Sequence, residues 1–527
     1  MKTLNLQLLN RSVFSLLWSG ALVMGLCLQP HVATATQSEW AQLGSDGKLI
    51  YKTLSTGDRI LDFSYAGYAG GGIKLPVVPV RKEVTPSGGD DSAVIQSAID
   101  AVAAMPMTDG FRGAVLLRAG TFHCNKPITL SQAGVVLRGS GSDKNGTVIE
   151  MTGAPHVCLT IDGERVKYPK DNPATIFSIA DNYVPSGALS FSVKDVKGLV
   201  AGDVILIRWL RSASWIHFMG MDTLVRDGKK QTWMKPDSPV SFERTIRSIQ
   251  GNRLVLNVPL TDAIDARFFA AVVVKTSSSK RLSQCGIESL RINSPPPAGT
   301  LAAANNTAVS LDSCEDCWVK DLAMHDTLNI VKVLSGARRI TIEAVHAAHT
   351  ASVEKGAGYP ADFSLLGSQI LVDRCSSSGD GAFYVASMNS GAVLNVALNC
   401  TFEGKGGIQP HMHWSTGLLI DSCNLPDGKI DFINRGTSGS GHGWAIGWAV
   451  AWNCTAKSFN VQQPPGAINW CIGCTGDMDW GKLKKGEVPP KPGLWLSSHG
   501  TPVEPKSLYL EQLRERLGPP ALANIGY

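Results

Sequence analysis

The 527-residue chain has few charged residues, and the two signs nearly balance. Lys, Arg, Asp and Glu make up 18% of it, and the formal net charge is +5. Without residues 1–35, which hold two basic and no acidic residues, the charge falls to +3. This balance indicates no particular partner and gives no support to nucleic-acid binding. Disorder is excluded too, since charged residues are few and aliphatic residues are well distributed, and the 54 glycines indicate a turn-rich β protein.

Long apolar runs are almost absent. The one candidate extends from Val13 to Leu28, is short for a membrane span and is interrupted by Ser19 and Gly20. Basic residues precede it and Ala33-Thr34-Ala35 follows, which is the order of a secretory signal peptide. We therefore expect cleavage near Ala35 and a secreted protein, periplasmic or extracellular. No later segment is long and apolar enough to cross a bilayer.

Cysteines after residue 35 number 11 of the 12, an odd count. In an oxidising compartment Cys314 can pair with Cys317, and Cys471 with Cys474. Zinc is disfavoured, because the two C-x-x-C pairs would have to meet across more than 150 residues. We interpret four further cysteines as small apolar residues that fill one interior row: Cys375, Cys400, Cys423 and Cys454.

One short phrase is repeated seven times between residues 287 and 454: an apolar residue, two mostly polar residues, then an apolar residue or Cys. The phrases are Ile287-Glu-Ser-Leu290, Val319-Lys-Asp-Leu322, Ile342-Glu-Ala-Val345, Val372-Asp-Arg-Cys375, Ala397-Leu-Asn-Cys400, Ile420-Asp-Ser-Cys423 and Ala451-Trp-Asn-Cys454. Their closing positions are 32, 23, 30, 25, 23 and 31 residues apart. Such a period predicts a solenoid of stacked coils, and the longer steps must carry projecting loops.

The first part of the chain, residues 36–155, is predicted to hold a Gly-rich lead-in, a capping helix and the first coils. Asp90-Asp91 is placed to cap a helix, and short β-branched pieces separated by Gly follow it. Such a helix would cover the open sheet edge at the end of a solenoid. Its apolar residues fall at helical spacing: Val94, Ile95, Ala98, Ile99 and Val102.

These residues resemble a known family. Asp90-Asp91, Ile95-Gln96, Ala98-Ile99-Asp100, Gly113-Ala-Val-Leu-Leu117 and Ala119-Gly-Thr-Phe122 look like the opening of the pectate-lyase-like superfamily. The resemblance implies an all-β chain that forms a right-handed parallel β-helix, and the repeated phrases extend it to about residue 475. It implies no single reaction, because the superfamily holds lyases, hydrolases, epimerases and phage spikes.

The coil rhythm breaks at residues 156–274, which we interpret as a β-rich insertion on the side of the helix. It contains an irregular aromatic stretch with residues such as Trp215, and we expect the insertion to overhang a groove. The main coils with the candidate active site follow at 275–480. The tail at 481–527 contains a short amphipathic helix from Pro505 to Leu517, which we expect to cover the C-terminal coil.

A first group of chemically capable residues follows the phrases. Asp326, His349 and Asp380 lie four, four and five residues beyond the end of their phrases. Since adjacent coils are about 4.8 Å apart, the three side chains are expected in one row, where they can move protons or hold a cation. The alternative is that they are unrelated groups at strand ends, because longer coils shift the register.

A second group lies further along the main coils. His442 is predicted on a projecting loop, because its coil is a long one, and its flanking glycines are expected to leave the ring exposed. Arg binds a carboxylate with two hydrogen bonds and Trp stacks on a sugar ring, although packing is the alternative role for tryptophan. The members of this group are His411, His413, Trp414, Arg435, His442 and Trp444.

These residues suit β-elimination of a uronate polysaccharide, which is the function we predict. A base removes the proton at C5, a cation neutralises the carboxylate and an acid assists the departing oxygen. The candidate catalytic residues are His349, Asp380, His411, His413, Arg435 and His442. The candidate substrate-binding residues are Asp326, Lys355, Tyr384, Trp414 and Trp444.

Cofactors and partners are less defined. Lyases of similar fold often use Lys or Arg as base with calcium on carboxylates, so calcium stays open as a cofactor. No run of Asp matches a calcium-binding motif, although Asp326, Asp362 and Asp380 could supply the ligands of one. We expect a polysaccharide substrate, no nucleic acid, no membrane span and a monomer.

A glycoside hydrolase is the first alternative, because carboxylates that flank a bond can hydrolyse it. Gly379-Asp380-Gly381 and Gly441-His442-Gly443 resemble segments of the polygalacturonase-type hydrolases. The chain departs from that pattern: the second Asp of the pair is Gly381, an Asn-Thr-Asp segment is missing, and 62 residues separate Asp380 from His442. A non-catalytic glycan-binding protein is the second alternative.

Overall fold

The computed structural model describes residues 36–166, 172–276, 281–295, 306–350, 361–380, 383–479, 491–494 and 498–527. The segment Ala35–Tyr527 forms one compact unit. The signal peptide predicted at 1–35 and the role predicted for Lys355 lie outside the described residues. Within these ranges, no helix combines the length and apolar character that crossing a membrane requires.

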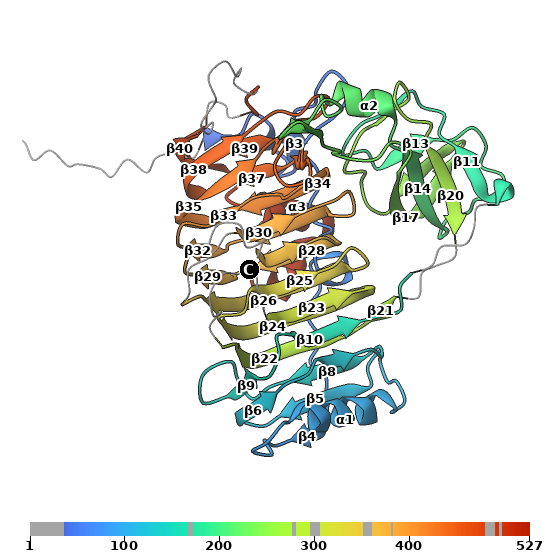
Figure 1. Ribbon diagram of the computed structural model, residues 1–527. Helices are drawn as coiled ribbons and strands as arrows, with labels where there is room; N and C mark the ends of the chain where they lie inside the picture. The colour runs from blue at the N-terminus through green and yellow to red at the C-terminus, as the bar shows by residue number, and fades with distance from the viewer. Residues whose placement is uncertain are drawn as a thin grey trace, which may run out of the picture. The chain divides into compact units, whose positions relative to one another are not determined.

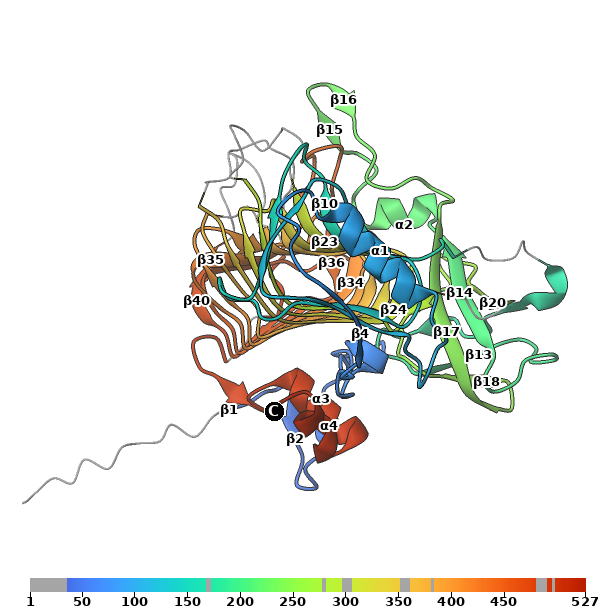
Figure 2. The same ribbon diagram turned by 90° about the horizontal axis from the view of Figure 1, so that it is seen from below.

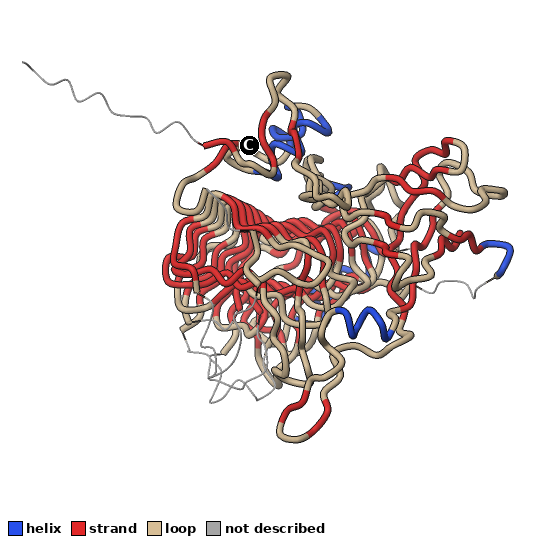
Figure 3. The backbone as a smooth tube through the Cα atoms, turned by 90° about the horizontal axis from the view of Figure 1, so that it is seen from above, coloured by secondary structure: helices blue, strands red, loops and turns tan. Residues whose placement is uncertain are grey.

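A right-handed parallel β-helix makes up most of the described chain, and its strands lie coil over coil (Figures 1 and 3). One sheet of 27 strands winds through it. Its strands are β4 (Val80–Val84), β5 (Gly113–Leu117), β6 (Gly120–Cys124), β7 (Ile128–Leu130), β8 (Val135–Arg138), β9 (Thr147–Met151), β10 (Val157–Asp162), β21 (Leu282–Ser283), β22 (Gly286–Asn293), β23 (Thr307–Asp312), β24 (Cys314–His325), β25 (Asn329–Val333), β26 (Arg338–Ala348), β27 (Ala361–Leu365), β28 (Ser368–Asp373), β29 (Ser376–Ser378), β30 (Phe383–Ser387), β31 (Val393–Leu398), β32 (Thr401–Glu403), β33 (Gly407–Ile408), β34 (Ser415–Asp421), β35 (Asn424–Phe432), β36 (Ile446–Gly447), β37 (Val450–Trp452), β38 (Thr455–Val461), β39 (Trp470–Ile472) and β40 (Thr475–Met478).

Smaller elements surround the coils. An antiparallel six-stranded sheet has the order β11 (Ile176–Ser178), β20 (Val272–Thr276), β14 (Val204–Leu210), β17 (Pro239–Gln250), β18 (Arg253–Leu256) and β13 (Ser190–Ser192). Short pairs join β1 (Thr36–Gln37) to β41 (Val503–Glu504), β2 (Ala41–Leu43) to β3 (Leu49–Tyr51), β12 (Tyr183–Val184) to β19 (Ile264–Asp265) and β15 (Val225–Arg226) to β16 (Lys229–Lys230). The helices are α1 (Ser92–Ala103), α2 (Ala213–Phe218), α3 (Leu508–Leu517) and α4 (Pro519–Asn524), with short 3-10 turns at Tyr68–Gly70 and Pro173–Thr175.

The seven repeated phrases stack in register. Ile287 pairs with Val319, Val319 with Ile342, and the pairing continues in the same way up to Ala451. The third residue of every phrase has a left-handed backbone, which turns the strand at a corner without adding a loop. Their φ values lie between 49° and 57°: Ser289, Asp321, Ala344, Arg374, Asn399, Ser422 and Asn453.

The cysteine row predicted for the interior is confirmed. Each of the four side chains is 1% exposed. Each thiol donates to a carbonyl oxygen of the preceding coil, as Cys400 does to Val372 O at 3.6 Å and Cys454 to Ile420 O at 3.2 Å. Every cysteine among the described residues is a free thiol, so the disulfides considered for Cys314–Cys317 and Cys471–Cys474 are not formed.

Helix α1 lies against the first coil, as predicted, and contacts β4, β5, β7 and β8 (Figure 1). Ile95, Ile99 and Val102 are buried against it. Val94 is 46% exposed, so its assignment to the apolar face was wrong. Asp90 Oδ1 accepts the backbone N–H of Ser92 at 3.2 Å, which satisfies a donor of the first turn.

The six-stranded sheet and α2 form the insertion, and they lie beside the coils (Figure 1). The predicted start of the insertion at residue 156 was too early. β10 falls within the predicted range but pairs with β7 and β23, so it is still a strand of the coil. Its alternating apolar residues, Cys158, Leu159 and Ile161, fill the coil interior.

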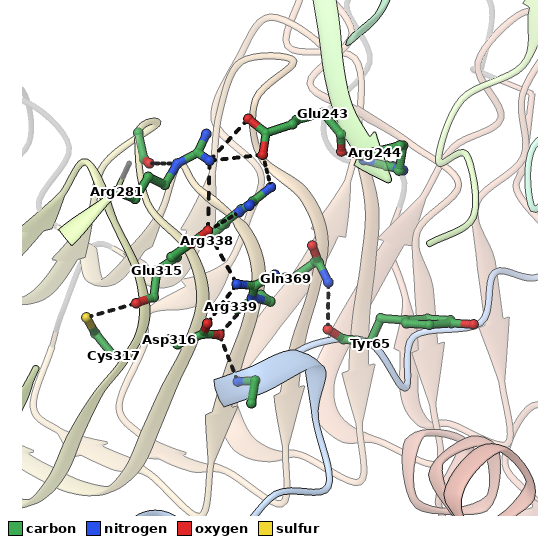
Figure 4. Close-up of polar contacts among 12 residues, drawn as sticks. Tyr65, Glu243, Arg244, Arg281, Glu315, Asp316, Cys317, Arg338, Arg339 and Gln369 are labelled. Carbon is green, nitrogen blue, oxygen red and sulfur yellow. Dashed lines mark hydrogen bonds and ion pairs between the residues drawn. The ribbon is translucent and has the colours of Figure 1, made fainter. Parts of the chain in front are cut away.

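An ion-pair network fastens the insertion to a row of coil corners (Figure 4). Glu243 of β17 pairs with Arg281 at 3.1 Å and with Arg338. Arg338 Nε also donates to Glu315 at 2.6 Å, and Arg339 pairs with Asp316 at 2.7 Å in the neighbouring position. The side chains of Glu243 and Arg281 are only 8% exposed, so these charges are compensated within the protein.

A second attachment uses a buried carboxylate of the insertion. Asp262 accepts the indole N–H of Trp414 at 2.8 Å and that of Trp448 at 3.0 Å. Burial raises the pKa of Asp262 to about 6, against the opposing effect of these hydrogen bonds. The two contacts hold the loop before β19 against the turn before β34 and the turn before β37.

The tail helices do not cover the last coil, contrary to the prediction. α3 and α4 lie on the flank of the coils beside β2 (Figure 2), and α3 contacts β34. Asp421 accepts the N–H of Tyr509 and the hydroxyl of Ser507, each at 2.8 Å. Tyr509 in turn donates to Ala66 O at 2.9 Å. The tail therefore fixes the lead-in to the side of the coil.

Candidate active site

The predicted site residues fall at two opposite edges of the parallel strands β27, β30 and β33. Residues that precede β27 or β30, with Asp362 at the start of β27, lie at one edge. Residues that follow β33 or β35 lie at the other, because parallel strands begin together and end together. We call the first set the acidic edge: Asp326, His349, Asp362 and Asp380. We call the second set the basic edge: His411, His413, Arg435 and His442.

At the basic edge, one guanidinium joins two coils. Arg435 Nη1 donates to His411 Nδ1 at 2.9 Å and to His411 O at 3.0 Å. Because an arginine only donates, His411 Nδ1 accepts, and the proton of the neutral ring sits on Nε2. The His411 and His442 rings lie 4.6 Å apart between centroids, so the imidazoles of successive coils are in contact.

The environment keeps these imidazoles neutral. Burial, followed by the neighbouring His442 and His413, lowers the pKa of His411 to about 3. Burial and Arg435 lower the pKa of His442 to about 4. Burial and the charge of Arg211 lower the pKa of His413, and burial lowers that of Arg435 to about 10. At neutral pH the edge therefore combines neutral imidazoles with cationic arginines.

His413 differs from the other two imidazoles in its hydrogen bonding. Its Nδ1 lies 3.3 Å from Asn389 Oδ1, which can only accept, so Nδ1 carries the proton. Nε2 then carries the lone pair, and it is buried with no hydrogen-bond partner among the described residues. The backbone of His413 is left-handed, with φ of 60°, which turns the side chain toward a pocket that also contacts the insertion.

The loop that carries His442 is held down by the insertion. Trp233 Nε1 donates to Trp444 O at 3.1 Å, and Arg226 donates to Gly439 O at 3.1 Å. The His442 ring is 7% exposed, so the prediction of an exposed ring was wrong. The flanking glycines serve close packing instead, since a Cβ on Gly443 would lie 2.4 Å from Trp233 Cδ1.

Three residues predicted to bind substrate are buried. Trp444 is 7% exposed and Trp414 is 5% exposed, with its indole N–H on Asp262. Tyr384 is fully buried, stacks on Phe402 at 4.9 Å and donates to Gly379 O at 3.3 Å. Packing, the alternative considered for the tryptophans, accounts for all three positions.

The acidic edge brings together two of the three residues predicted to share a row. Backbone hydrogen bonds align Asp326 with His349, and His349 with Gly379, so Asp380 is one position beyond the row. Its Oδ1 accepts the backbone N–H of Lys405 at 3.2 Å. The two coils are in register from His346 and Ser376 onward, so Asp380, five residues beyond its phrase where Asp326 and His349 are four beyond theirs, falls outside the row.

The partner of His349 is Asp362 of β27. His349 Nε2 lies 2.9 Å from Asp362 Oδ1, and the two side chains are 11% and 4% exposed. Burial lowers the pKa of His349, but the hydrogen bond and charge of Asp362 outweigh it, and the pKa is raised. Asp326 binds the N–H and hydroxyl of Thr350, each at 2.7 Å. In the described part of the chain, no three His, Cys, Asp or Glu side chains converge as a metal site requires.

Sequence reasoning missed the residues that the insertion brings to the basic edge. Arg211, Lys235 and Ser238 lie with Asn389, Ser390 and His413 around a pocket of about 370 Å³. Phe383 was missed as well; its ring lies 6.0 Å from the Arg435 guanidinium. No local signal marks Arg211, Lys235 and Ser238, because their contacts with the coils depend on how the insertion docks. Phe383 meets Arg435 through the stacking of coils.

Comparisons with known proteins identify no family for this chain. No protein-family model matches the chain, and no curated protein matches its sequence. Among solved structures, the tailspike protein gp49 from Pseudomonas phage LKA1 is 13% identical, with 80% of this chain and 76% of that chain covered and a TM-score of 0.37. A tailspike protein mutant of E. coli bacteriophage HK620, in complex with a pentasaccharide, is 10% identical with coverages of 88% and 70% and a TM-score of 0.42. The A-module of the Azotobacter vinelandii mannuronan C-5 epimerase AlgE6 is 11% identical, with coverages of 79% and 73% and a TM-score of 0.31.

Proposed function

We propose that this chain is a secreted polysaccharide lyase that cleaves a uronate-containing polysaccharide by β-elimination at the basic edge. The observation that carries the proposal is the contact of His413 Nδ1 with Asn389 Oδ1 at 3.3 Å, which leaves the lone pair on Nε2. A neutral imidazole with a defined lone pair is a general base, and the lowered pKa keeps it unprotonated at neutral pH.

In the proposed reaction, His413 Nε2 takes the proton from C5 of the uronate. The electrons of that C–H bond form the double bond between C4 and C5, and the C4–O bond breaks. The departing oxygen takes up the proton that His413 gained, so the imidazole ends neutral. A cation beside the carboxylate stabilises the negative charge that develops there. Arg435, His411 and His442 act behind His413 as positioning residues.

The test is incubation of the purified protein with uronate polysaccharides. Elimination conjugates a new double bond with the carboxylate, so ultraviolet absorbance should rise in step with new reducing ends. Reducing ends without this absorbance would instead mean hydrolysis, and binding without either product would mean a glycan-binding protein. Secretion is checked separately by the N-terminus of the exported protein, which should follow Ala35.

A glycoside hydrolase is the second candidate, and the acidic edge is the observation that favours it. Asp326 and Asp362 flank His349 there, and Asp362 Oδ2 is buried with no hydrogen-bond partner among the described residues. Paired carboxylates are what hydrolysis requires. The basic edge has the stronger claim to the chemistry, because Asp362 is already committed to His349 and Asp326 to Thr350.

A further inference from the structure

The pocket beside His413 has an unusual charge. Its residues come from the insertion and from the coils. Those that the structure describes include Arg211, Lys235 and His413 but no carboxylate. The remaining polar residues are hydroxyls and amides, such as Ser238, Ser390 and Asn389. A pocket of about 370 Å³ has room for a sugar residue, and its charge selects against a cationic ligand.

Arg211 is the cation most firmly held in this pocket. It directly follows β14 and is half-buried. Its Nη1 donates to Ser238 Oγ at 2.7 Å and its Nη2 donates to Ser390 Oγ. Both partners are neutral hydroxyls, whereas the half-buried arginines of the network in Figure 4 pair with carboxylates, as Arg338 does with Glu315. Within the described ranges, Arg211 has no carboxylate partner.

This arrangement fits an anionic ligand better than an empty surface. A partly buried guanidinium is costly unless it is paired, and a carboxylate is the partner whose geometry matches it. Burial lowers the pKa of Arg211, because removing the guanidinium from water disfavours its charged form. Arg211 also acts on the pKa of His413, so the two groups are electrostatic neighbours across the pocket.

We infer that Arg211, with Lys235 at the rim, binds the carboxylate of the uronate residue presented to His413. The inference rests on the proposed function and goes beyond it, because it assigns substrate choice to the insertion and not to the coils. The ligand class is an acidic sugar with a free carboxylate. A methyl ester of the same sugar lacks the charge and should bind poorly at this position.

The test measures equilibrium binding by calorimetry with trisaccharides of galacturonate, glucuronate and mannuronate, each as free acid and as methyl ester. For the trisaccharide that binds, Arg211→Ala should weaken the acid by about 10- to 100-fold and leave the ester unchanged. Arg211→Lys keeps the charge but loses the bidentate hydrogen bonding, so it should weaken binding of the free acid by about tenfold. Equal binding of acid and ester by the unmodified protein would overturn the inference.

Two further variants separate ligand binding from folding. Arg253→Ala is a matched control, since Arg253 is also an insertion arginine that donates to a serine hydroxyl, Ser190 Oγ at 2.9 Å. It should leave the affinity unchanged. Ser390→Ala removes the coil contact of Arg211 but keeps the guanidinium, so it should cost less affinity than Arg211→Ala. A larger loss with Ser390→Ala would mean that Arg211 is only an anchor.

The outcomes also separate this inference from the proposed function. Binding that depends on Arg211, without an unsaturated product, would refute the lyase and support the subsite. The opposite outcome is an unsaturated product together with equal affinities for acid and ester, in both the unmodified protein and Arg211→Ala. It would support the lyase and refute the subsite.

Discussion

The acidic edge and the basic edge both contain buried histidines, but the pKa values of these histidines are shifted in opposite directions. His349 of the acidic edge has a carboxylate at 2.9 Å, and its pKa is raised. His411 and His442 of the basic edge face arginine and other imidazoles, and their pKa values fall to about 3 and about 4. All of these rings are largely buried, so the difference comes from the neighbouring charge. Identical side chains a few coils apart therefore have pKa values shifted in opposite directions, upward at the acidic edge and downward at the basic edge.

The largest effect is expected when the base of the basic edge is removed. His413→Ala should lower the rate of elimination by about 10²- to 10⁴-fold, since that is what a general base contributes. The rate is followed by the absorbance of the unsaturated product. His346→Ala is the matched control, because His346 is an exposed coil histidine bonded to Ser376 Oγ, and it should retain full activity. If instead Asp380→Asn abolished turnover and His413→Ala did not, the acidic edge would be the site.

Breaking the pair at the acidic edge should affect stability and leave the chemistry intact. Asp362→Ala leaves His349 buried without its carboxylate, which should cost about 3–5 kcal/mol in unfolding free energy. Asp380→Ala, which removes one backbone contact, should cost about 1 kcal/mol or less. Chemical denaturation measures both. Equal losses of unfolding free energy from the two variants would show that the His349–Asp362 contact stabilises the protein no more than the Asp380 contact does.

The same pair predicts a pH dependence of stability. The pKa of His349 is raised on folding, so its contribution is fully present below the ordinary pKa of 6.5 and is lost as pH rises through the folded value. Without Asp362, burial would lower the pKa, and stability would instead rise with pH across that window. Denaturation of Asp362→Ala and the unmodified protein between about pH 5 and 8 distinguishes the two slopes.

A smaller effect is expected from moving His442 without replacing it. A Cβ on Gly439 would lie 2.1 Å from His442 Nε2, so Gly439→Ala should displace the ring and lower the elimination rate by about tenfold. Gly436→Ala is the control, because its φ is +50° against +57° at Gly439 but no atom lies within 4 Å. If both variants lost the same activity, backbone strain and not the position of His442 would be responsible.

The smallest effect is a displacement of the pH profile. The pKa of His413 is lowered, so the elimination rate should be retained as the pH falls through 6.5. It should decline only at a more acidic pH. Titration of the histidine ring protons by NMR should place His349 above 6.5 and His413 below it. A rate that halves near 6.5 would contradict the assigned environment of His413.

The solenoid could be predicted because its signal is local and repeated. Each phrase has an apolar first residue and a closing residue that point into the coil, and the stacking in register follows from their spacing. Asp380 shows the limit, since it lies five residues beyond its phrase and not four, and that difference of one places it outside the row. Arg211 shows another limit. Its contact with Ser390 joins positions 179 residues apart, and no pattern in the chain connects them.

The interior row of thiols makes the timing of folding important for this protein. Burial raises the pKa of Cys375, Cys423 and Cys454, so these three sulfurs stay protonated in the closed coils, where oxidants do not reach them. In the unfolded chain the same sulfurs are ordinary thiols, and any two of them can pair. A disulfide formed then would join coils whose side chains must later stack separately. Susceptibility to oxidation is therefore confined to the interval before the coils close, and a slower-folding variant should accumulate mispaired chains even where the finished protein resists oxidation.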